Sequence, residues 1–552
     1  MSEENSKKDA FENQDIPREY GALLKNSFFS FLNTYGTFIF SIISSFLLAR
    51  LIEDTPWGYF VLGLSYIQIV SLITKLLPPS LNNALKYYIP RLVSLDDKNR
   101  LKRFILRAIF IKMTFLIPIF IISVLFFSLF SNIYLINLPE ENVSIVFLLS
   151  PLIIINNLQL ILNSINIGFN KFKTVFISFL TQYLIYIAFQ LYYFFFFHFI
   201  DLEALSLIYV TAALVPFLMN IIIVSRNIYK IKVSGKSDTS IKDDFQDMVK
   251  YGSLVRAATF FTDIWAEIQI QSIGVFRPES VFGFKISRDL LSVPVNASAA
   301  VAVPLTISFT GFIAKEKKEN IVAIYNLIMK YLIFFMGLLT GLLFFFADLF
   351  IAFIYREPRL IYSDLVKLYL FTYVFLIVSG PVVSLLLAEN KGKYLVLIRF
   401  IGFLLQFPLF LVLLIFLSLY YAIFGIIISN LLYSILFLYV AIKIGNMKLN
   451  IKRIFFNYLI FFFSLGLTLI LEYFLLDDIN NWLLLNLNPS LFRVFNPFSL
   501  IVFFLVFMFL IIEFRVLTVG DINNLQSFFI KKSIVHKITN RALNFLKRIL
   551  KE

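Results

Sequence analysis

Long apolar stretches separated by short polar segments extend over almost the whole chain of 552 residues. A helix needs about 20 mostly apolar residues to cross the hydrocarbon layer of a membrane, and fourteen stretches meet this requirement. The longest predicted external segment, 475–496, has only 22 residues, so no loop forms a separate globular domain. The pattern predicts an all-α integral membrane protein with spans at 27–51, 58–79, 108–130, 143–165, 174–197, 204–225, 251–273, 285–314, 331–354, 364–388, 394–417, 422–442, 454–474 and 497–518. The eighth span contains Pro294 and Pro304 and is the one most expected to be broken.

An internal repeat relates the first twelve spans. The starts of spans one to six recur as the starts of spans seven to twelve, at offsets of 218 to 227 residues. Because six is even, both halves enter the membrane in the same direction, as in transporters with parallel repeats, which bind substrate between the halves. The repeat predicts two parallel six-helix lobes around a central cavity, plus two extra C-terminal helices. The predicted divisions are a cytoplasmic tail 1–26, an N-lobe 27–225, a cytoplasmic linker 226–250, a C-lobe 251–442, spans thirteen and fourteen within 443–518, and a basic amphipathic segment 519–552.

The net charge of +15 is concentrated on one side of the predicted spans. With the N-terminus in the cytoplasm, the inside segments hold 36 of the 49 Lys and Arg residues, and the outside segments hold 4. This asymmetry follows the positive-inside rule and predicts a multi-pass plasma-membrane protein with both termini cytoplasmic. The basic residues are spread over eight segments, so a nucleic-acid partner is not expected. In 519–552, apolar residues at helical spacing favour an interfacial helix over a solvated basic tail.

Charged residues inside the seventh predicted span indicate that one of its faces does not meet lipid. Arg256, Asp263 and Glu267 lie within 251–273, and a charge at the centre of a membrane helix costs about 2.5–3.5 kcal/mol on insertion scales. At about 100° per residue, the three side chains fall within about 20° of one another. This face therefore lines a polar cavity or meets partner side chains. The alternative is that Arg256 pairs with Asp263 and only holds helices together.

Polar stripes of the same kind occur on other predicted spans. A polar lumen between the two halves would accommodate them together. Lys112, Lys367 and Arg515 lie near span ends and are expected to reach toward the headgroups instead. The stripes include Lys75 on span two, Asn156 and Asn163 on span four, Lys285, Arg288 and Asp289 on span eight, and Arg399 on span eleven.

Short sequence motifs occur in both predicted halves. They are Leu-Leu-Ala-Arg-Leu-Ile (47–52) and Trp-Gly-Tyr (57–59) in the first half, then Asp263, Ile-Gly (273–274) and Val-Phe-Gly-Phe (281–284) in the second. With these motifs, the span count and the repeat, roughly residues 20–520 resemble the Wzx-type polysaccharide flippases of the multidrug/oligosaccharidyl-lipid/polysaccharide exporter superfamily. Phe284 stands where the family commonly has tyrosine. The resemblance implies two lobes around a cavity and transfer of an isoprenoid-pyrophosphate-linked oligosaccharide to the outer leaflet, for surface polysaccharide synthesis.

Such a substrate is anionic and rich in hydroxyl groups, which gives the polar stripes expected roles. Lys and Arg bind phosphate, and amide side chains suit hydroxyls. The carboxylates Asp263, Glu267 and Asp289 are candidates for coupling transport to a proton or sodium gradient, because no ATP-binding motif is present; otherwise they balance the basic charges. The expected substrate-binding residues are Arg256, Lys285, Arg288, Lys75, Arg50, Arg399, Asn156 and Asn163.

The composition argues against several other classes of site. The chain has no cysteine and only two histidines, so disulfides and Cys- or His-ligated metals are not expected, and neither catalytic residues nor bound cofactors are predicted. A membrane-embedded polymerase is disfavoured because the outer loops are short. A peptidoglycan lipid-precursor flippase and a multidrug/cation antiporter of the same superfamily remain alternatives. The expected partners are the lipid-linked sugar, membrane lipids and other polysaccharide-assembly proteins.

The charge asymmetry leads to a prediction about topology. A single cysteine in place of Lys236, within the linker 226–250, should remain unlabelled by a membrane-impermeant maleimide in intact cells and become labelled after permeabilisation. Single cysteines in 131–142 and 475–496 serve as positive controls, because both segments are predicted to be external. Labelling of the cysteine at position 236 in intact cells would contradict the predicted orientation.

Overall fold

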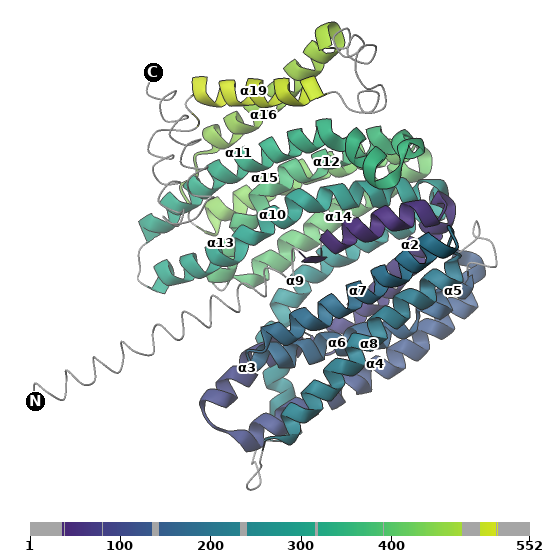
Figure 1. Cartoon of the computed structure of the whole chain (residues 1–552). Coiled ribbons are helices and arrows are strands. Elements are labelled where there is room, and N and C mark those ends of the chain that lie inside the picture. Colours follow the sequence, from purple (N-terminus) through teal and green to yellow (C-terminus); the bar gives the residue numbers. More distant parts are fainter. Residues whose placement is uncertain are drawn as a thin grey trace, which may run out of the picture. The chain divides into compact units, whose positions relative to one another are not determined.

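The computed structural model describes residues 36–37, 39–79, 81–134, 143–231, 240–314, 318–389, 391–445, 447–476, 497–514 and 516. These residues form helices and their connections, with no β-strand in the described part (Figure 1). The predicted all-α class is therefore confirmed. The predicted tail 1–26, the segment 519–552 and most of 475–496 lie outside the described residues.

The helices follow one another in the order that the apolar runs predict. Within the described residues, each of the fourteen predicted spans lies on one helix or on consecutive helical segments; residues 27–35 and 38 of the first span and 515, 517 and 518 of the fourteenth lie outside them. In the described ranges, ten segments are long and apolar enough to cross a membrane, while Ile39–Leu51 and Phe498–Glu513 are apolar but shorter. α9 and α10, which carry the charged stripes, are not among the ten, so the count of fourteen spans stays a prediction. The longer helices are α2 (Asp54–Leu76), α3 (Leu81–Ser94), α4 (Lys98–Tyr134), α5 (Val143–Leu149), α6 (Pro151–Gly168), α7 (Phe172–Phe196), α8 (Leu202–Tyr229), α9 (Ile241–Phe276), α10 (Val281–Ala314), α11 (Lys318–Phe350), α12 (Ser363–Val374), α13 (Ser379–Ala388), α14 (Gly392–Phe416), α15 (Leu419–Lys443), α16 (Ile451–Leu471) and α19 (Pro497–Glu513).

The helix interruptions do not lie where the prolines of the eighth span predict them. α10 continues as one helix through Pro294 and Pro304, so the expected break is wrong. Membrane helices tolerate proline where neighbouring groups satisfy the freed backbone carbonyl. The fourth predicted span is instead divided at Ser150, whose hydroxyl donates to the Phe147 carbonyl at 2.8 Å. A short 3₁₀ turn, η5 (Phe375–Val378), divides the tenth span into α12 and α13.

α3 is a helix that the hydropathy pattern did not predict, because it lies in a segment assigned to a cytoplasmic loop. Its apolar side packs in a buried cluster with the first turns of α4 and with parts of α6, α8 and α9. The cluster includes Leu85 and Ile89 of α3, Phe104 and Ile105 of α4, and Met248 of α9. The predicted loop 80–107 is thus largely helical, and its core joins α9 to helices of the first half.

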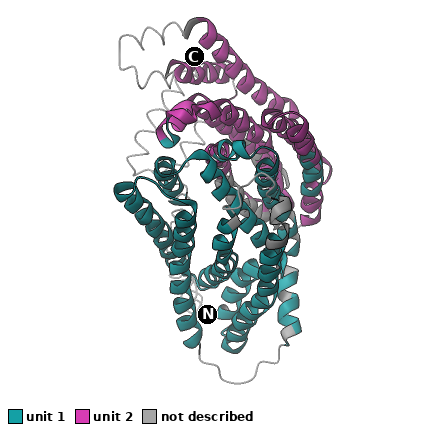
Figure 2. Cartoon of the chain, turned by 90° about the vertical axis from the view of Figure 1, so that its right-hand side faces the viewer, with its two compact units in different colours: residues 1–285, 354–356, 399–407 teal, residues 286–353, 357–398, 408–552 magenta. Residues whose placement is uncertain are grey.

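The chain divides into two compact units (Figure 2). Unit 1 comprises residues 1–285, 354–356 and 399–407, and unit 2 comprises residues 286–353, 357–398 and 408–552. α9 belongs to unit 1 because it packs against α2, α3 and α4. The continuous part of unit 1 therefore extends to residue 285, whereas the predicted N-lobe ends at residue 225. The division into two six-helix lobes stays a prediction.

Unit 2 has a core rich in phenylalanine that includes the two extra C-terminal helices. α16 and α19 pack against each other and against α11. Phe461 of α16, Phe503 and Phe507 of α19, and Phe345 of α11 are buried in one cluster. The close approach of α11 and α19 depends on Gly341, because a Cβ added there would lie 2.0 Å from Cζ of Phe503. Small residues allow membrane helices to approach closely in this way.

The contact at Gly341 predicts a specific packing defect. Gly341→Ala should destabilise unit 2 by about 1–3 kcal/mol, because the new methyl group overlaps the buried, rigid ring of Phe503. The loss is measurable as lower detergent-solubilised yield and a lower midpoint of thermal unfolding. Gly466→Ala on α16 is the matched control, since nothing lies within 4 Å of the position that its new Cβ would take. Equal behaviour of the two variants would contradict the proposed contact.

Candidate functional site

The charged face of α9 carries an ion pair that the spacing of its residues predicts. Nη1 of Arg256 lies 3.0 Å from Oδ2 of Asp263, two helical turns further along. The same nitrogen donates to the hydroxyl of Thr259 at 3.3 Å. The side chain of Arg256 is 14% exposed and that of Asp263 is 42% exposed. The carboxylate therefore holds one edge of the guanidinium while keeping access to its surroundings.

The opposite edge of the Arg256 guanidinium has no hydrogen-bond acceptor in the described part of the structure. Its Nε and Nη2 atoms are both buried and make no hydrogen bond there. These two nitrogens form the side of the guanidinium that presents two parallel N–H groups, the geometry that matches a phosphate or carboxylate. Buried donors of this kind normally have a partner. Arg256 is thus half satisfied by Asp263 and retains a fork suited to an anion.

Close approach of α2 to α9 fixes the position of this charged face. Gly274 lies against Leu62, and a Cβ there would come 2.2 Å from Cδ2 of Leu62. Nε2 of Gln271 donates to the Leu62 carbonyl at 2.9 Å, and the Ser65 hydroxyl donates to the Glu267 carbonyl at 3.3 Å. The predicted candidate Glu267 therefore lies on the side of α9 that packs against α2.

Two lysines from neighbouring helices share the electrostatic environment of Arg256. Lys75, at the end of α2, interacts electrostatically with Arg256, Asp263 and Glu267. Lys112 of α4 interacts with Lys75 and Arg256. The structure thus brings the predicted candidate Lys75 together with the α9 charges, and it adds Lys112, which was expected at the headgroup region from its place in the sequence.

The prediction that Lys112 reaches toward the headgroups is wrong. Its side chain is buried, with 3% of its surface exposed, and Nζ donates to the carbonyl of Thr74. Carbonyls in the last turn of a helix have no intrahelical partner and attract positive charge, which explains why a lysine lies at the end of α2. Lys367 pairs with Asp348 at 2.7 Å, and Arg515 lies outside the described residues.

Thr74 also connects this region to α6. Its hydroxyl approaches Oδ1 of Asn157 at 2.6 Å, and Asn157 is buried. The polar stripe of the fourth predicted span contains the neighbouring Asn156 instead, which is half-buried. The sequence pattern therefore selected Asn156, whereas the amide that contacts α2 belongs to Asn157, the next residue. Only the relative rotation of α2 and α6 decides between two adjacent asparagines.

The other amide candidate, Asn163, belongs to a network that joins α6, α7 and α8. Its Oδ1 accepts a hydrogen bond from Asn220 at 3.1 Å, and Asn220 also donates to Ser178 at 2.8 Å. Gln159 donates to the same Ser178 hydroxyl at 2.7 Å. Asn163 thus joins α6 to α8, and the network of neutral hydrogen bonds extends to α7 through Ser178.

Lys285 and Arg50 lie in a second group, with aromatic rings and backbone carbonyls. Nζ of Lys285 is 4.8 Å from the ring centroid of Trp57 and 5.5 Å from that of Tyr355, so it makes cation–π contacts. Nη1 of Arg50 donates to the carbonyls of Phe46 at 2.7 Å and Ile354 at 3.2 Å. Trp57 and Lys75 are separated by about 27 Å along α2, at 1.5 Å per residue. The structure therefore places these two candidates at the opposite end of α2 from Arg256.

The remaining candidates are distributed over α14 and α10. Arg399 begins the part of α14 that belongs to unit 1. This part packs along α9 through aromatic contacts, such as Phe261 with Phe400 at 5.2 Å between ring centroids. Arg288 and Asp289 lie on α10 in unit 2, where the Asp289 carbonyl accepts a hydrogen bond from Ser292 at 2.6 Å. A cavity shared by Arg288, Asp289 and the charges of α9 stays a prediction.

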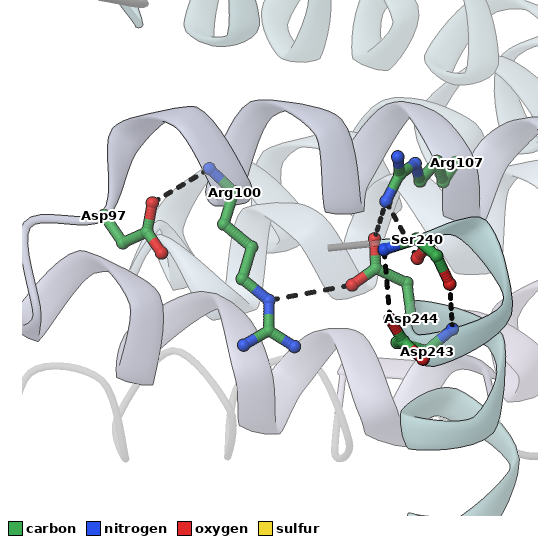
Figure 3. Close-up of polar contacts among 6 residues, drawn as sticks. All are labelled: Asp97, Arg100, Arg107, Ser240, Asp243 and Asp244. Carbon is green, nitrogen blue, oxygen red and sulfur yellow. Dashed lines mark hydrogen bonds and ion pairs between the residues drawn. The ribbon is translucent and has the colours of Figure 1, made fainter. Parts of the chain in front are cut away.

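A further charged cluster, not selected from the sequence, joins the starts of α4 and α9 (Figure 3). The carboxylate of Asp244 is completely buried, with Nη1 of Arg107 at 2.5 Å and Nε of Arg100 at 3.6 Å. The Arg107 guanidinium also donates to the Ser240 carbonyl at 3.1 Å. Ser240 and Asp243 form a capping box that begins α9, with reciprocal bonds of 3.1 and 3.0 Å. Charged residues of a predicted cytoplasmic linker thus fix the first turn of α9.

Comparisons with solved structures show that the fold of this chain is similar to that of several membrane transporters. The chain is similar to a structure of lipid II flippase MurJ in an inward closed conformation, with a TM-score of 0.63 and 15% identity over 89% of this chain and 99% of that one. An inward-facing multidrug resistance MATE family transporter gives a TM-score of 0.61 and 15% identity over 74% and 94%. A MOP superfamily transporter from Pyrococcus furiosus, described as having a binding pocket of reverse polarity, gives 0.56 and 14% over 77% and 95%.

A match to a protein-family model assigns the chain to a family, which the fold similarities alone do not do. The model of the polysaccharide biosynthesis proteins matches residues 23–305, and the chain belongs to this family. The resemblance inferred from the motifs is therefore confirmed at the level of the family and the superfamily fold. No curated protein sequence matches the chain.

The capping box of α9 predicts a pH dependence of local stability. Hydrogen bonds from the Ser240 backbone N–H and hydroxyl hold the pKa of Asp243 below its ordinary value of 3.8. A lowered folded-state pKa contributes stability that is complete above the ordinary value and is lost as pH falls through the folded value. Asp243→Asn should therefore speed amide hydrogen exchange in 241–248 at pH 6 and have little effect near pH 2.

The hydrogen-exchange measurement at the two pH values has a control variant and an outcome that would contradict the prediction. Exchange rates are corrected for the intrinsic effect of pH, and Glu279→Gln, at an exposed position of unit 1, tests for a general effect of removing a carboxylate. An Asp243→Asn effect of the same size at both pH values would show that the charge of Asp243 does not support the cap.

Proposed function

We propose that the protein is a flippase that moves isoprenoid-pyrophosphate-linked oligosaccharide units across the plasma membrane by alternating access, for surface polysaccharide synthesis. Membership of the polysaccharide biosynthesis protein family supports the process, and the MOP-superfamily fold supports a transport role. In this proposal both termini are cytoplasmic, as the charge asymmetry predicts, and the partners are the lipid-linked sugar and other polysaccharide-assembly proteins.

The observation that carries the proposal is the half-satisfied guanidinium of Arg256. Asp263 holds Nη1, and the buried Nε and Nη2 atoms present an unused fork to an incoming group. A phosphate oxygen pair accepts two parallel N–H bonds from such a fork, and Arg suits this geometry better than Lys does. The pyrophosphate of the substrate would therefore complete the hydrogen bonds that Arg256 lacks.

The charge balance around Arg256 also favours an anionic ligand. Arg256, Lys75 and Lys112 provide three basic groups, while Asp263 and Glu267 provide two carboxylates, so the basic groups outnumber the acidic ones. Bringing charges together in a low-dielectric region is unfavourable unless they are compensated. A diphosphate supplies the compensating charge, whereas a cationic drug would add to the excess. This balance makes a multidrug/cation antiporter the weaker alternative.

Coupling to an ion gradient is assigned in this proposal to Asp263. Its carboxylate is the more exposed member of the Arg256–Asp263 ion pair. When a phosphate binds the guanidinium of Arg256, this carboxylate can release Arg256 and bind a proton or Na⁺ instead. Glu267 and Asp289 remain secondary candidates for the same role.

A peptidoglycan lipid-precursor flippase is the second candidate function. It is supported by the similarity to a lipid II flippase over 89% of the chain, and a pyrophosphate-linked substrate would use the same Arg256 fork.

The decisive experiment compares Arg256 variants in proteoliposomes loaded with a pyrophosphate-linked oligosaccharide. Arg256→Lys preserves the charge but removes the fork, so the transport rate should fall about tenfold to a hundredfold, the equivalent of a charged hydrogen bond worth about 1.5–3 kcal/mol. Reconstituted protein amount and thermal stability should remain near wild type. Asp263→Asn should change the dependence of transport on an imposed proton or sodium gradient.

The double variant Arg256→Gln with Asp263→Asn separates function from structural pairing. A purely structural pair can be replaced by neutral residues, so both protein abundance and transport would recover in the double variant. The proposal expects abundance to recover while transport remains low. Full transport by the neutral pair would refute it. Supplying either a surface-polysaccharide unit or a peptidoglycan precursor then distinguishes the two candidate substrates.

A further inference from the structure

The start of α4 carries two arginines that converge on one buried carboxylate. Arg100 and Arg107 are separated by two helical turns and therefore project from the same face of α4. Both point toward Asp244, which comes from the first turn of α9 (Figure 3). All three residues belong to unit 1. The arrangement is a small anion-binding site whose occupant is a side chain of the same protein.

Asp244 satisfies this site only in part. Its Oδ2 atom pairs closely with Arg107, but Oδ1 lies 3.6 Å from Nε of Arg100, beyond ordinary hydrogen-bond distance. Oδ1 is buried and makes no hydrogen bond in the described part of the structure. Asp244 therefore makes one close ion pair, with Arg107, and one longer one, with Arg100. A diphosphate has acceptor oxygens on two phosphorus atoms and spans a greater distance.

We propose that Arg100 and Arg107 form a cytoplasmic loading site for the diphosphate of the lipid-linked substrate, and that Asp244 occupies this site when no substrate is present. This inference rests on the proposed function for the direction of transport. When a diphosphate takes the place of Asp244, the first turn of α9 loses its ionic connection to α4. The contact therefore both blocks the loading site and holds the start of α9 in place.

The location of the cluster links loading to the Arg256 site. Asp244 and Arg256 lie on the same helix, about 18 Å apart at 1.5 Å per residue. Met248, one turn after Asp244, is fully buried in the core shared by α3 and α4. Release of Asp244 removes the ion pairs to α4 and leaves the apolar packing of Met248 and Phe245 and the Ser240–Arg107 bond among the contacts at the beginning of α9. A diphosphate bound at α4 thus acts on the helix that carries the second anion site.

The competing interpretation is that Asp244 only holds α4 and α9 together. The two interpretations differ for Asp244→Asn, which removes the internal anion with little change in shape. A structural role predicts lower stability and no new binding. The loading-site proposal predicts that a second diphosphate binds more tightly than in wild type, because the arginines lose the carboxylate that competes with it. Asp244→Asn with Arg107→Gln tests whether any gain in affinity needs the arginine.

The experiment measures binding of farnesyl diphosphate to the full-length protein in nanodiscs by isothermal titration calorimetry. Wild type should bind a second equivalent only weakly, because Asp244 competes for the site, and Asp244→Asn should bind it at least tenfold more tightly, a gain that the additional Arg107→Gln removes. Lys98→Gln is the matched control, since Lys98 lies at the same end of α4 in an exposed pair with Asp96 at 3.0 Å. It should bind as wild type does. An unchanged affinity for the second equivalent in Asp244→Asn, or a gain in affinity that persists without Arg107, would overturn the proposal.

A second measurement covers the case in which Asp244→Asn does not fold. In a protein that keeps Asp244, a single cysteine at Met248 should react at least fivefold faster with a soluble maleimide when farnesyl diphosphate is added, because displacement of Asp244 loosens the start of α9. Unchanged reactivity at saturating ligand would contradict the proposal. Inorganic pyrophosphate serves as a second ligand. Acceleration by pyrophosphate alone, without any effect of farnesyl diphosphate, would exclude a lipid-linked ligand and overturn the loading site.

The outcomes also separate this inference from the proposed function. Farnesyl diphosphate carries no sugar, and neither binding measurement requires translocation. A protein that gains affinity for the second diphosphate in Asp244→Asn but does not transport oligosaccharide supports the loading site and refutes the flippase proposal. A protein that transports the oligosaccharide but gains no such affinity supports the flippase proposal and refutes the loading site.

Discussion

A charged side chain at membrane depth must exchange its water shell for groups of the protein, and this requirement shapes unit 1. Three basic residues there meet the requirement in different ways. Arg256 takes a carboxylate two turns along its own helix, Lys112 takes a carbonyl at the end of α2, and Lys285 takes two aromatic rings. Because Thr74 and Trp57 of α2 are partners of Lys112 and Lys285, these charges favour a position of α2 beside the helices that carry the two lysines.

The close approach of α2 and α9 follows from the same requirement. An arginine and two carboxylates on one face of α9 cannot be turned to lipid, so that face needs a neighbour that offers polar groups. α2 offers the Ser65 hydroxyl, the Leu62 carbonyl and Lys75 at its end. Gly274 permits the helices to approach until its Cα lies against Leu62. The Ile-Gly motif at 273–274 thus has a steric explanation, in addition to its value for recognising the family.

The sequence predicts the helices well because a membrane span is a local property of the chain. Length and apolar composition suffice to place a helix on every predicted span, and a spacing of seven residues suffices to predict the Arg256–Asp263 pair. α3 was not predicted from hydropathy because a short amphipathic helix is buried by other helices and not by lipid. Pro294 and Pro304 suggested a break, yet whether a proline interrupts a helix depends on the groups around it.

The candidate site was less predictable, because its residues are selected by contacts between helices. Position along a span suggested that Lys112 reaches toward the headgroups, but the carbonyl of Thr74 on another helix decides its direction. Asn156 and Asn157 are equivalent in sequence, and the rotation of α6 against α2 separates them. Asp244 lies in a segment predicted to be a cytoplasmic linker, and only its contacts with Arg100 and Arg107 of α4 show why it is buried.

The two ion pairs of α9 differ in a way that relates them to one another. In the Arg256 pair the cation is incompletely satisfied, since two buried nitrogens make no hydrogen bond in the described region. In the Asp244 pair the anion is incompletely satisfied, since one buried oxygen makes none there. An anionic group that binds Arg256 completes the first pair, and one that replaces Asp244 releases the second. Because both pairs lie on one helix, a single diphosphate-bearing substrate can first detach the start of α9 and then bind further along it, which gives the helix a direction of loading that neither site would provide alone.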